Sequence, residues 1–159
     1  MNLEHRTSNK QRDAAVCGRS VSAIGRVYDL EERLLEFAVA VIDVTERLPN
    51  TRAGNHLAGQ LLRSGTSPYG NHGEAQAPES MDDFIHKFKV CLKELREARR
   101  WARLVERKNW LSEDPRLLFL LREADELIRI FKASIQTAER NRLAAARVTG
   151  RTTSSTKAV

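Results

Sequence analysis

The feature that most constrains the fold is a run of apolar residues spaced alternately by four and three within residues 80–109. Seven residues follow this spacing: Phe84, Phe88, Cys91, Leu95, Ala98, Ala102 and Val105. An α-helix turns once in about 3.6 residues, so steps of four and three keep side chains on one face. The spacing therefore predicts a long helix with one buried face. Ser80 is the expected N-cap, followed by acids in the first turn, where the helix dipole favours them.

The same period occurs near the start of the chain, between Leu30 and Leu48. Its apolar positions are Leu30, Leu34, Phe37, Val41, Val44 and Leu48. Asp29 and Glu32 form a capping-box pattern before it, and Pro49 ends it. Leu35, Ala38 and Ile42 widen the apolar face, as a helix in a bundle requires.

A third periodic segment begins at Asp114, a favoured N-cap residue, followed by Pro115 at the favoured first position. Its apolar positions are Leu117, Leu121, Ala124, Ile128, Phe131, Ile135 and Ala138, with Leu120 and Leu127 beside them. The periodicity fades after Arg140. We expect a helix over this segment and a flexible, Thr-, Ser- and Arg-rich tail from Ala144 onward.

The segment between the first two helices is less regular. Residues 56–63 are amphipathic, but Gly65, Pro68, Gly70 and Gly73 follow. Each interior Gly costs about 1 kcal/mol relative to Ala and an interior Pro about 3 kcal/mol. The helix either ends near Ser67 or continues through Pro68 with a kink. We favour the kinked helix reaching about Gln76, in which small residues let a neighbouring backbone approach closely.

Four helices with short connections predict an all-α, antiparallel up-down-up-down four-helix bundle. We expect one domain over residues 28–141, a disordered basic extension over 1–27 and a disordered basic tail over 142–159. The net charge of +6 comes from these ends, which carry +3 and +4, whereas residues 28–141 carry −1. Any basic surface on the bundle must therefore come from segregation of charge, not from an excess.

Several classes of protein are disfavoured by the sequence. The longest apolar runs, 37–42 and 117–121, are too short to span a membrane, and the N-terminus has no secretory signal pattern. Cys17 and Cys91 are the only cysteines, and only Cys91 lies on a predicted buried face. We expect no disulfide and no membrane, and a cytoplasmic location.

No constellation with a specific catalytic or metal-binding pattern is present. Asp83 and His86 have the closest spacing to a bundle metal motif, but a capping acid and a surface histidine explain them better. His72 and Glu74 offer a polar site in the irregular segment, but satisfying the backbone around Pro68 is the simpler role. We expect a non-enzymatic protein with no catalytic residues, metal or cofactor.

The clearest functional feature is a second stripe on the helix of residues 80–109, in which every member is basic. It consists of Lys89, Lys93, Arg96, Arg100, Arg103 and Arg107. The stripe lies about 150° around the helix from the apolar face and is about 27 Å long. Like charges at these spacings destabilise a helix by about 0.2–0.5 kcal/mol per pair, so stability alone does not favour them.

Three explanations of this stripe remain open from the residues alone. It binds a polyanion such as RNA or DNA, it contacts an acidic protein surface, or it is a solvated face. Acids on another helix or subunit, such as Glu123, Asp125 and Glu126, would neutralise it. Trp101 and Leu92 flank the apolar face, and there is no aromatic series for base stacking.

The chain resembles the 23S rRNA-intervening-sequence proteins, a family that includes accessory variability determinants of diversity-generating retroelements. The resemblance covers residues 29–140, and its most specific part is the run Gln60-Leu-Leu-Arg-Ser-Gly-Thr-Ser67 with Asn71 and Glu74-Ala75 downstream. It also includes Phe37-Ala38, Leu48-Pro49, Glu79-Ser80, Asp83-Phe84-Ile85, Lys93-Glu94-Leu95-Arg96-Glu97 and Trp101. Gly70 and Gly73 depart from the more helical sequence that is usual in this family.

The resemblance implies a bundle that assembles as a homopentameric barrel. For the retroelement members it also implies a basic surface that binds nucleic acid and a reverse transcriptase. We therefore expect a non-enzymatic, oligomeric protein that contacts RNA or DNA phosphates through the basic stripe, without sequence specificity. The alternative is a scaffold for a protein partner such as a reverse transcriptase.

Overall fold

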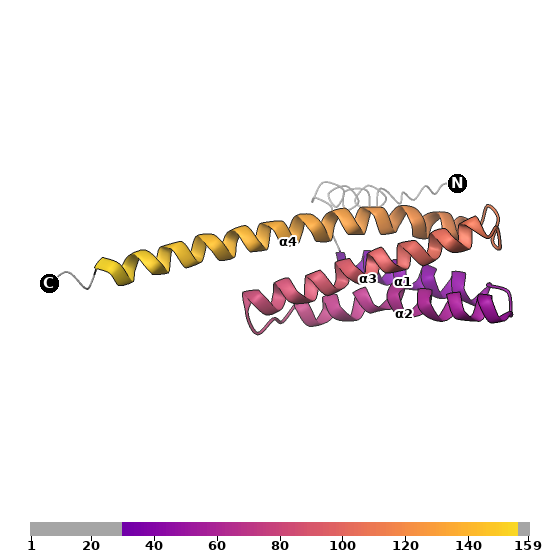
Figure 1. Cartoon of the computed structure of the whole chain (residues 1–159), viewed down its shortest axis with the longest axis horizontal. Helices are drawn as coiled ribbons and strands as arrows, with labels where there is room; N and C mark the ends of the chain where they lie inside the picture. Colours follow the sequence, from indigo (N-terminus) through magenta and orange to yellow (C-terminus); the bar gives the residue numbers. More distant parts are fainter. Residues whose placement is uncertain (1–29, 156–159) are drawn as a thin grey trace, which may run out of the picture.

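A computed structural model describes residues 30–155 of the chain, and side chains through residue 147. It contains four helices: α1 (Leu30–Glu46), α2 (Arg52–Ala75), α3 (Met81–Arg107) and α4 (Pro115–Ser155) (Figure 1). All four predicted helices are confirmed. The expected basic extension over residues 1–27 and the expected cap Asp29 lie outside the described residues.

The helices form a bundle in which each packs against its neighbours in the chain. α2 contacts α1 and α3, and α4 contacts α3 and α1, whereas the described residues give no contact between α1 and α3 or between α2 and α4. This pattern places α1 diagonally opposite α3 across the core. The predicted antiparallel four-helix bundle is confirmed, with short connections joining adjacent helices (Figure 1).

The core consists of the periodic apolar positions. Phe88, Cys91, Leu95, Ala98, Ala102 and Val105 on α3 are all buried, and Phe84 packs against the core edge. The expectation that three further residues widen the buried face of α1 is confirmed for Ala38, which is buried, and wrong for the other two. Leu35 and Ile42 do not widen the buried face, because they are 38% and 40% exposed. Neither neighbouring helix covers the side of α1 that carries Leu35 and Ile42, so the buried face is narrower than predicted and is led by Leu34, Phe37 and Val41.

Side-chain caps define three of the helix starts. The Thr51 hydroxyl accepts a hydrogen bond from the backbone N–H of Gly54 (3.1 Å), and the Ser80 hydroxyl accepts one from that of Asp83 (3.1 Å). The Asp114 carboxylate accepts bonds from the N–H groups of Arg116 (2.8 Å) and Leu117 (3.2 Å). These bonds satisfy donors that have no partner within the helix, as the sequence predicted at Ser80 and Asp114.

The α2 helix continues through Pro68 to Ala75, which confirms the longer of the two alternatives. Tertiary packing compensates for the weak local propensity, because Pro68 is buried and the Cys91 thiol donates to the Pro68 carbonyl oxygen at 3.5 Å. Gly65 lies against Val41 of α1 so closely that a Cβ there would come within 2.4 Å of a Val41 methyl group. Burial also raises the pKa of the Cys91 thiol to about 12.

The α4 helix is longer than the sequence indicated. It runs to Ser155, beyond Arg140 where the apolar period fades, and projects past the end of the bundle (Figure 1). The predicted disordered tail is therefore helical over residues 142–155. Strong helix formers from Leu143 to Ala146 continue a helix that the bundle has already nucleated, so each added residue needs only propagation. Side chains 142–147 are exposed.

Candidate nucleic-acid interface

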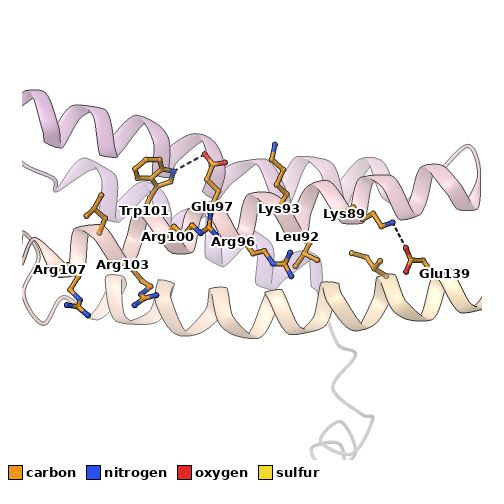
Figure 2. A pocket seen from close by; sticks show the side chains of 12 residues that line it. Lys89, Leu92, Lys93, Arg96, Glu97, Arg100, Trp101, Arg103, Arg107 and Glu139 are labelled. Atoms are coloured by element: carbon orange, nitrogen blue, oxygen red, sulfur yellow. Dashed lines mark hydrogen bonds and ion pairs between the residues drawn. The ribbon is translucent and has the colours of Figure 1, made fainter.

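The basic stripe lies on the outer face of α3. All six side chains of the stripe are exposed, and together they line an open groove with a volume of about 1120 Å³. Figure 2 shows them along α3, beside Glu139 of α4. The structure thus brings together every residue that the sequence assigned to this site. They share one surface because the apolar face of the same helix is held in the core.

Apolar side chains form part of the groove between the cations. Leu92, Leu104 and Trp101 of α3 line it, together with Ile135 of α4. Leu92 is nearly buried, whereas Leu104 is 41% exposed. The groove therefore combines a cationic rim with an apolar surface, and it runs along the side of the bundle where α3 meets α4.

Two of the six cations already have carboxylate partners. Lys89 Nζ lies 2.7 Å from Glu139 Oε1 of α4, and the bond to Lys89 lowers the pKa of the Glu139 carboxyl (Figure 2). Lys93 Nζ lies 3.9 Å from Glu94 Oε1, at the outer limit for an ion pair. The Lys89 pair is half-exposed and screened by solvent, so it contributes little to stability.

The other four cations are free of such partners. Arg96, Arg100, Arg103 and Arg107 form no ion pair or hydrogen bond with any side chain of the described part of the chain. Four exposed guanidinium groups therefore follow one another on one face. Guanidinium groups bind phosphate oxygens in a bidentate manner, and this arrangement presents them along a line.

The acids that were expected to neutralise the stripe are paired elsewhere. Glu123 accepts a bond from Arg33 of α1 at 2.5 Å, Asp125 lies 2.7 Å from Arg99, and Glu126 lies 2.6 Å from Arg129. Within one copy of the chain, neutralisation by these three carboxylates is therefore excluded. Among the described residues, only Glu94 and Glu139 pair with members of the stripe, and none pairs with its four arginines.

Trp101 is held at the edge of the groove by contacts with α2. Its indole N–H donates to Glu97 Oε1 at 3.3 Å (Figure 2), and Arg63 of α2 donates to the same oxygen at 2.9 Å. The imidazole of His56 packs edge-on against the indole, with ring centroids 6.1 Å apart. These contacts fix the indole in place.

The weaker sequence candidates do not converge on a second site. His72 is buried beside Phe88 and Phe131, whereas Glu74 is exposed and pairs with Lys87 at 2.9 Å. Asp83 also faces Lys87, at 3.6 Å, and accepts a bond from the Glu79 N–H. Among residues 30–147, no three His, Cys, Asp or Glu side chains are grouped as metal ligands would be.

Six groove residues were not predicted as part of the site, and three of them are Leu92, Glu97 and Trp101 of α3. Leu104 lies on α3 next to Arg103, and Ile135 and Glu139 come from α4. The periodicity of α4 assigned Ile135 to the core, which is correct because it is 6% exposed. Sequence spacing cannot show that its edge also faces the groove, because that depends on how α3 and α4 pack.

None of the helices in the described residues has the length and apolar content that crossing a bilayer requires. Comparisons with known proteins identify relatives that share most of the bundle. The family model described as 23S rRNA-intervening sequence protein matches residues 28–133. A search of curated proteins finds no match.

A solved structure with the same fold comes from Bacteroides thetaiotaomicron and is described as a protein with unknown function from the S23 ribosomal protein family. It is 30% identical to this chain and superposes with a TM-score of 0.60. The match covers 66% of this chain and 96% of that one.

Proposed function

The chain belongs to the 23S rRNA-intervening sequence protein family, and from that premise we propose that it binds the phosphates of RNA or DNA along the α3 groove. The observation that carries the proposal is the line of four exposed arginines without carboxylate partners in the described residues. The family name alone does not support nucleic-acid binding, because it describes no contact between the protein and a nucleic acid.

The dimensions of the groove suit a nucleic-acid backbone. The stripe is about 27 Å long, and phosphates along one strand of a duplex are about 3.4 Å apart, so several phosphates fit beside it. Lysine and arginine contacts to phosphates position a nucleic acid without reading its sequence. Binding through this groove is therefore independent of sequence.

Two further features support the proposal. The described bundle is close to neutral, so its cations are segregated on α3 and not simply in excess. Arg147 on the projecting part of α4 is exposed and adds positive charge beyond the end of the groove. The Arg142 guanidinium pairs with Asp82, which raises its pKa.

The first prediction concerns two arginines in the middle of the stripe. Replacing Arg96→Glu and Arg100→Glu together should weaken binding to random RNA and duplex DNA at least about tenfold, because two phosphate contacts become repulsions. Fluorescence anisotropy with labelled oligonucleotides at constant salt measures this change.

A matched control separates the groove from bulk charge. Arg52→Glu with Arg122→Glu changes the net charge equally, since each double variant lowers it from +6 to +2. Arg52 and Arg122 are exposed and lie outside the groove. Binding should fall much less in this control. Equal losses of binding affinity in the two double variants would show that the groove is not the binding site.

The apolar surface of the groove supports a second candidate function, a scaffold for a protein partner. Leu92, Leu104 and Ile135 suit the apolar face of a helix better than they suit phosphates. A helix that fits would need acidic residues beside its apolar face. The assembly expected from the family resemblance, a homopentamer, stays a prediction.

A further inference from the structure

A second line of side chains runs along α3 beside the four arginines of the groove. Each arginine is followed in the sequence by one member of this line, so the two lines are about 100° apart around the helix. The members are Glu97, Trp101, Leu104 and Lys108. Trp101 and Leu104 line the groove, and Leu104 is 41% exposed. The groove therefore has a cationic side and, parallel to it, a partly apolar side.

The two sides of the groove face different neighbours of α3. Figure 2 shows Trp101 and Glu97 on the side next to α2, whereas Arg103 and Arg107 extend toward α4. The carboxylate of Glu97 lies 2.9 Å from the guanidinium of Arg63, so its negative charge is offset beside the groove. The apolar side therefore does not repel a polyanion.

The Trp101 indole is ready to accept a flat ligand. It is partly exposed in the groove, and the hydrogen bond to Glu97 and the ring of His56 already hold it in place. A ligand that stacks on the indole immobilises no additional side chain, which lowers the entropic cost of binding. Every nucleobase has a π-face, so stacking on an indole tolerates any base sequence.

A duplex can use only the cationic side of the groove. Its bases are stacked on one another inside the helix, and its outer surface offers mainly phosphates and sugars. A single strand carries the same phosphates together with unpaired bases, which can reach the parallel apolar side. Because α3 has no series of aromatic residues, the base contacts are confined to Trp101 and the neighbouring Leu104.

We propose that the α3 groove binds single-stranded RNA or DNA in preference to duplex, with phosphates on the arginine line and a base stacked on Trp101. This inference rests on the proposed function, because the phosphate contacts hold the strand in the groove. The preference increases with salt concentration, since salt weakens the phosphate contacts and leaves stacking largely unchanged.

The emission of Trp101 reports the base contact directly once the second tryptophan is replaced. Trp110 lies outside the groove, with Lys108 Nζ 5.8 Å from its ring, and phenylalanine keeps an aromatic ring there. In the Trp110→Phe variant of the full chain, oligothymidylate or oligouridylate of about 20 nucleotides should quench the emission of Trp101. The quenching should saturate together with binding measured by fluorescence anisotropy.

Two further probes separate the bases from the phosphates. A duplex of the same length and an abasic single strand both carry phosphates without accessible base faces. At physiological salt, each should bind at least about fivefold more weakly than oligothymidylate and leave the emission of Trp101 nearly unchanged. A duplex that binds as tightly as the single strand would overturn the preference.

Replacing the indole tests its part in binding. Trp101→Leu should lower the affinity for oligothymidylate at least about fivefold and change that for duplex less than about twofold. The matched control Trp110→Phe should alter neither affinity, and circular dichroism shows whether each variant is folded. A purely structural role of Trp101 would lower both affinities together. If Trp101→Leu does not fold, the quenching experiment decides.

The outcomes distinguish this inference from the proposed function. Unquenched Trp101 emission at a saturating concentration of single strand, or equal losses of both affinities in Trp101→Leu, would overturn the base contact and leave phosphate binding intact. The proposed function fails instead if Arg96→Glu with Arg100→Glu binds both nucleic acids as wild type does.

Discussion

Close packing between α1 and α2 depends on the absence of a side chain at Gly65. A Cβ at this position would lie 2.4 and 2.8 Å from the two methyl groups of Val41, which is fully buried and cannot move aside freely. Gly65→Ala should therefore destabilise the bundle by about 1–3 kcal/mol, the usual effect of overpacking a core. Urea unfolding followed by circular dichroism measures it.

Gly70 provides the matched control on the same helix. Nothing lies within 4 Å of a Cβ added there, so Gly70→Ala should raise the free energy of unfolding by up to about 1 kcal/mol through helix propensity. Adding Val41→Ala to Gly65→Ala should recover part of the loss, because it removes the clashing methyl groups. Similar effects of Ala at positions 65 and 70 would show that α1 and α2 are not packed this closely.

At the scale of the element, the projecting part of α4 is separable from the bundle. Side chains 143–147 are exposed, whereas Ile135 and Ala138 are buried in the bundle. A chain that ends at Leu143 should therefore keep its melting temperature within about 2 °C. It should bind nucleic acid more weakly, because three positive charges are lost with residues 144–159. A large drop in melting temperature would show that this part of α4 supports the core.

The positions of the helices could be predicted because their apolar periods and capping residues are local signals. Ser80 and Asp114 cap the helices that follow them, as the sequence indicated. The exposure of Leu35 and Ile42 could not be predicted in this way, because periodicity gives the apolar face of a helix but not which part of it a neighbour covers.

The candidate site was predicted only in part, because sequence patterns show which residues share a helix face but not how separate helices pack. The basic stripe belongs to one helix, so its alignment follows from spacing alone. The contributions of Ile135 and Glu139, and the ion pairs of Glu123 and Asp125, join residues that are far apart in sequence. Such pairings depend on the packing of α4 against α1 and α3, which no local signal contains.

At the scale of the whole molecule, the bundle separates its charges although their sum is close to zero. α3 presents four arginines that have no carboxylate partner among the described residues, and α1 presents the exposed Glu31, Glu36 and Glu46 diagonally across the core. Such segregation gives a nearly neutral bundle one surface that attracts polyanions and another that repels them. If the proposed function holds, a bound nucleic acid therefore lies on the α3 side.

The salt dependence of binding tests the central claim most directly. Plotting the logarithm of the binding constant for duplex DNA against that of the salt concentration gives a slope of about −0.9 per phosphate contact. Replacing Arg96, Arg100, Arg103 or Arg107 singly by Gln should each reduce the slope by about one, whereas Arg122→Gln should leave it unchanged. A wild-type slope near zero, or one that none of the four replacements alters, would contradict phosphate binding in the α3 groove.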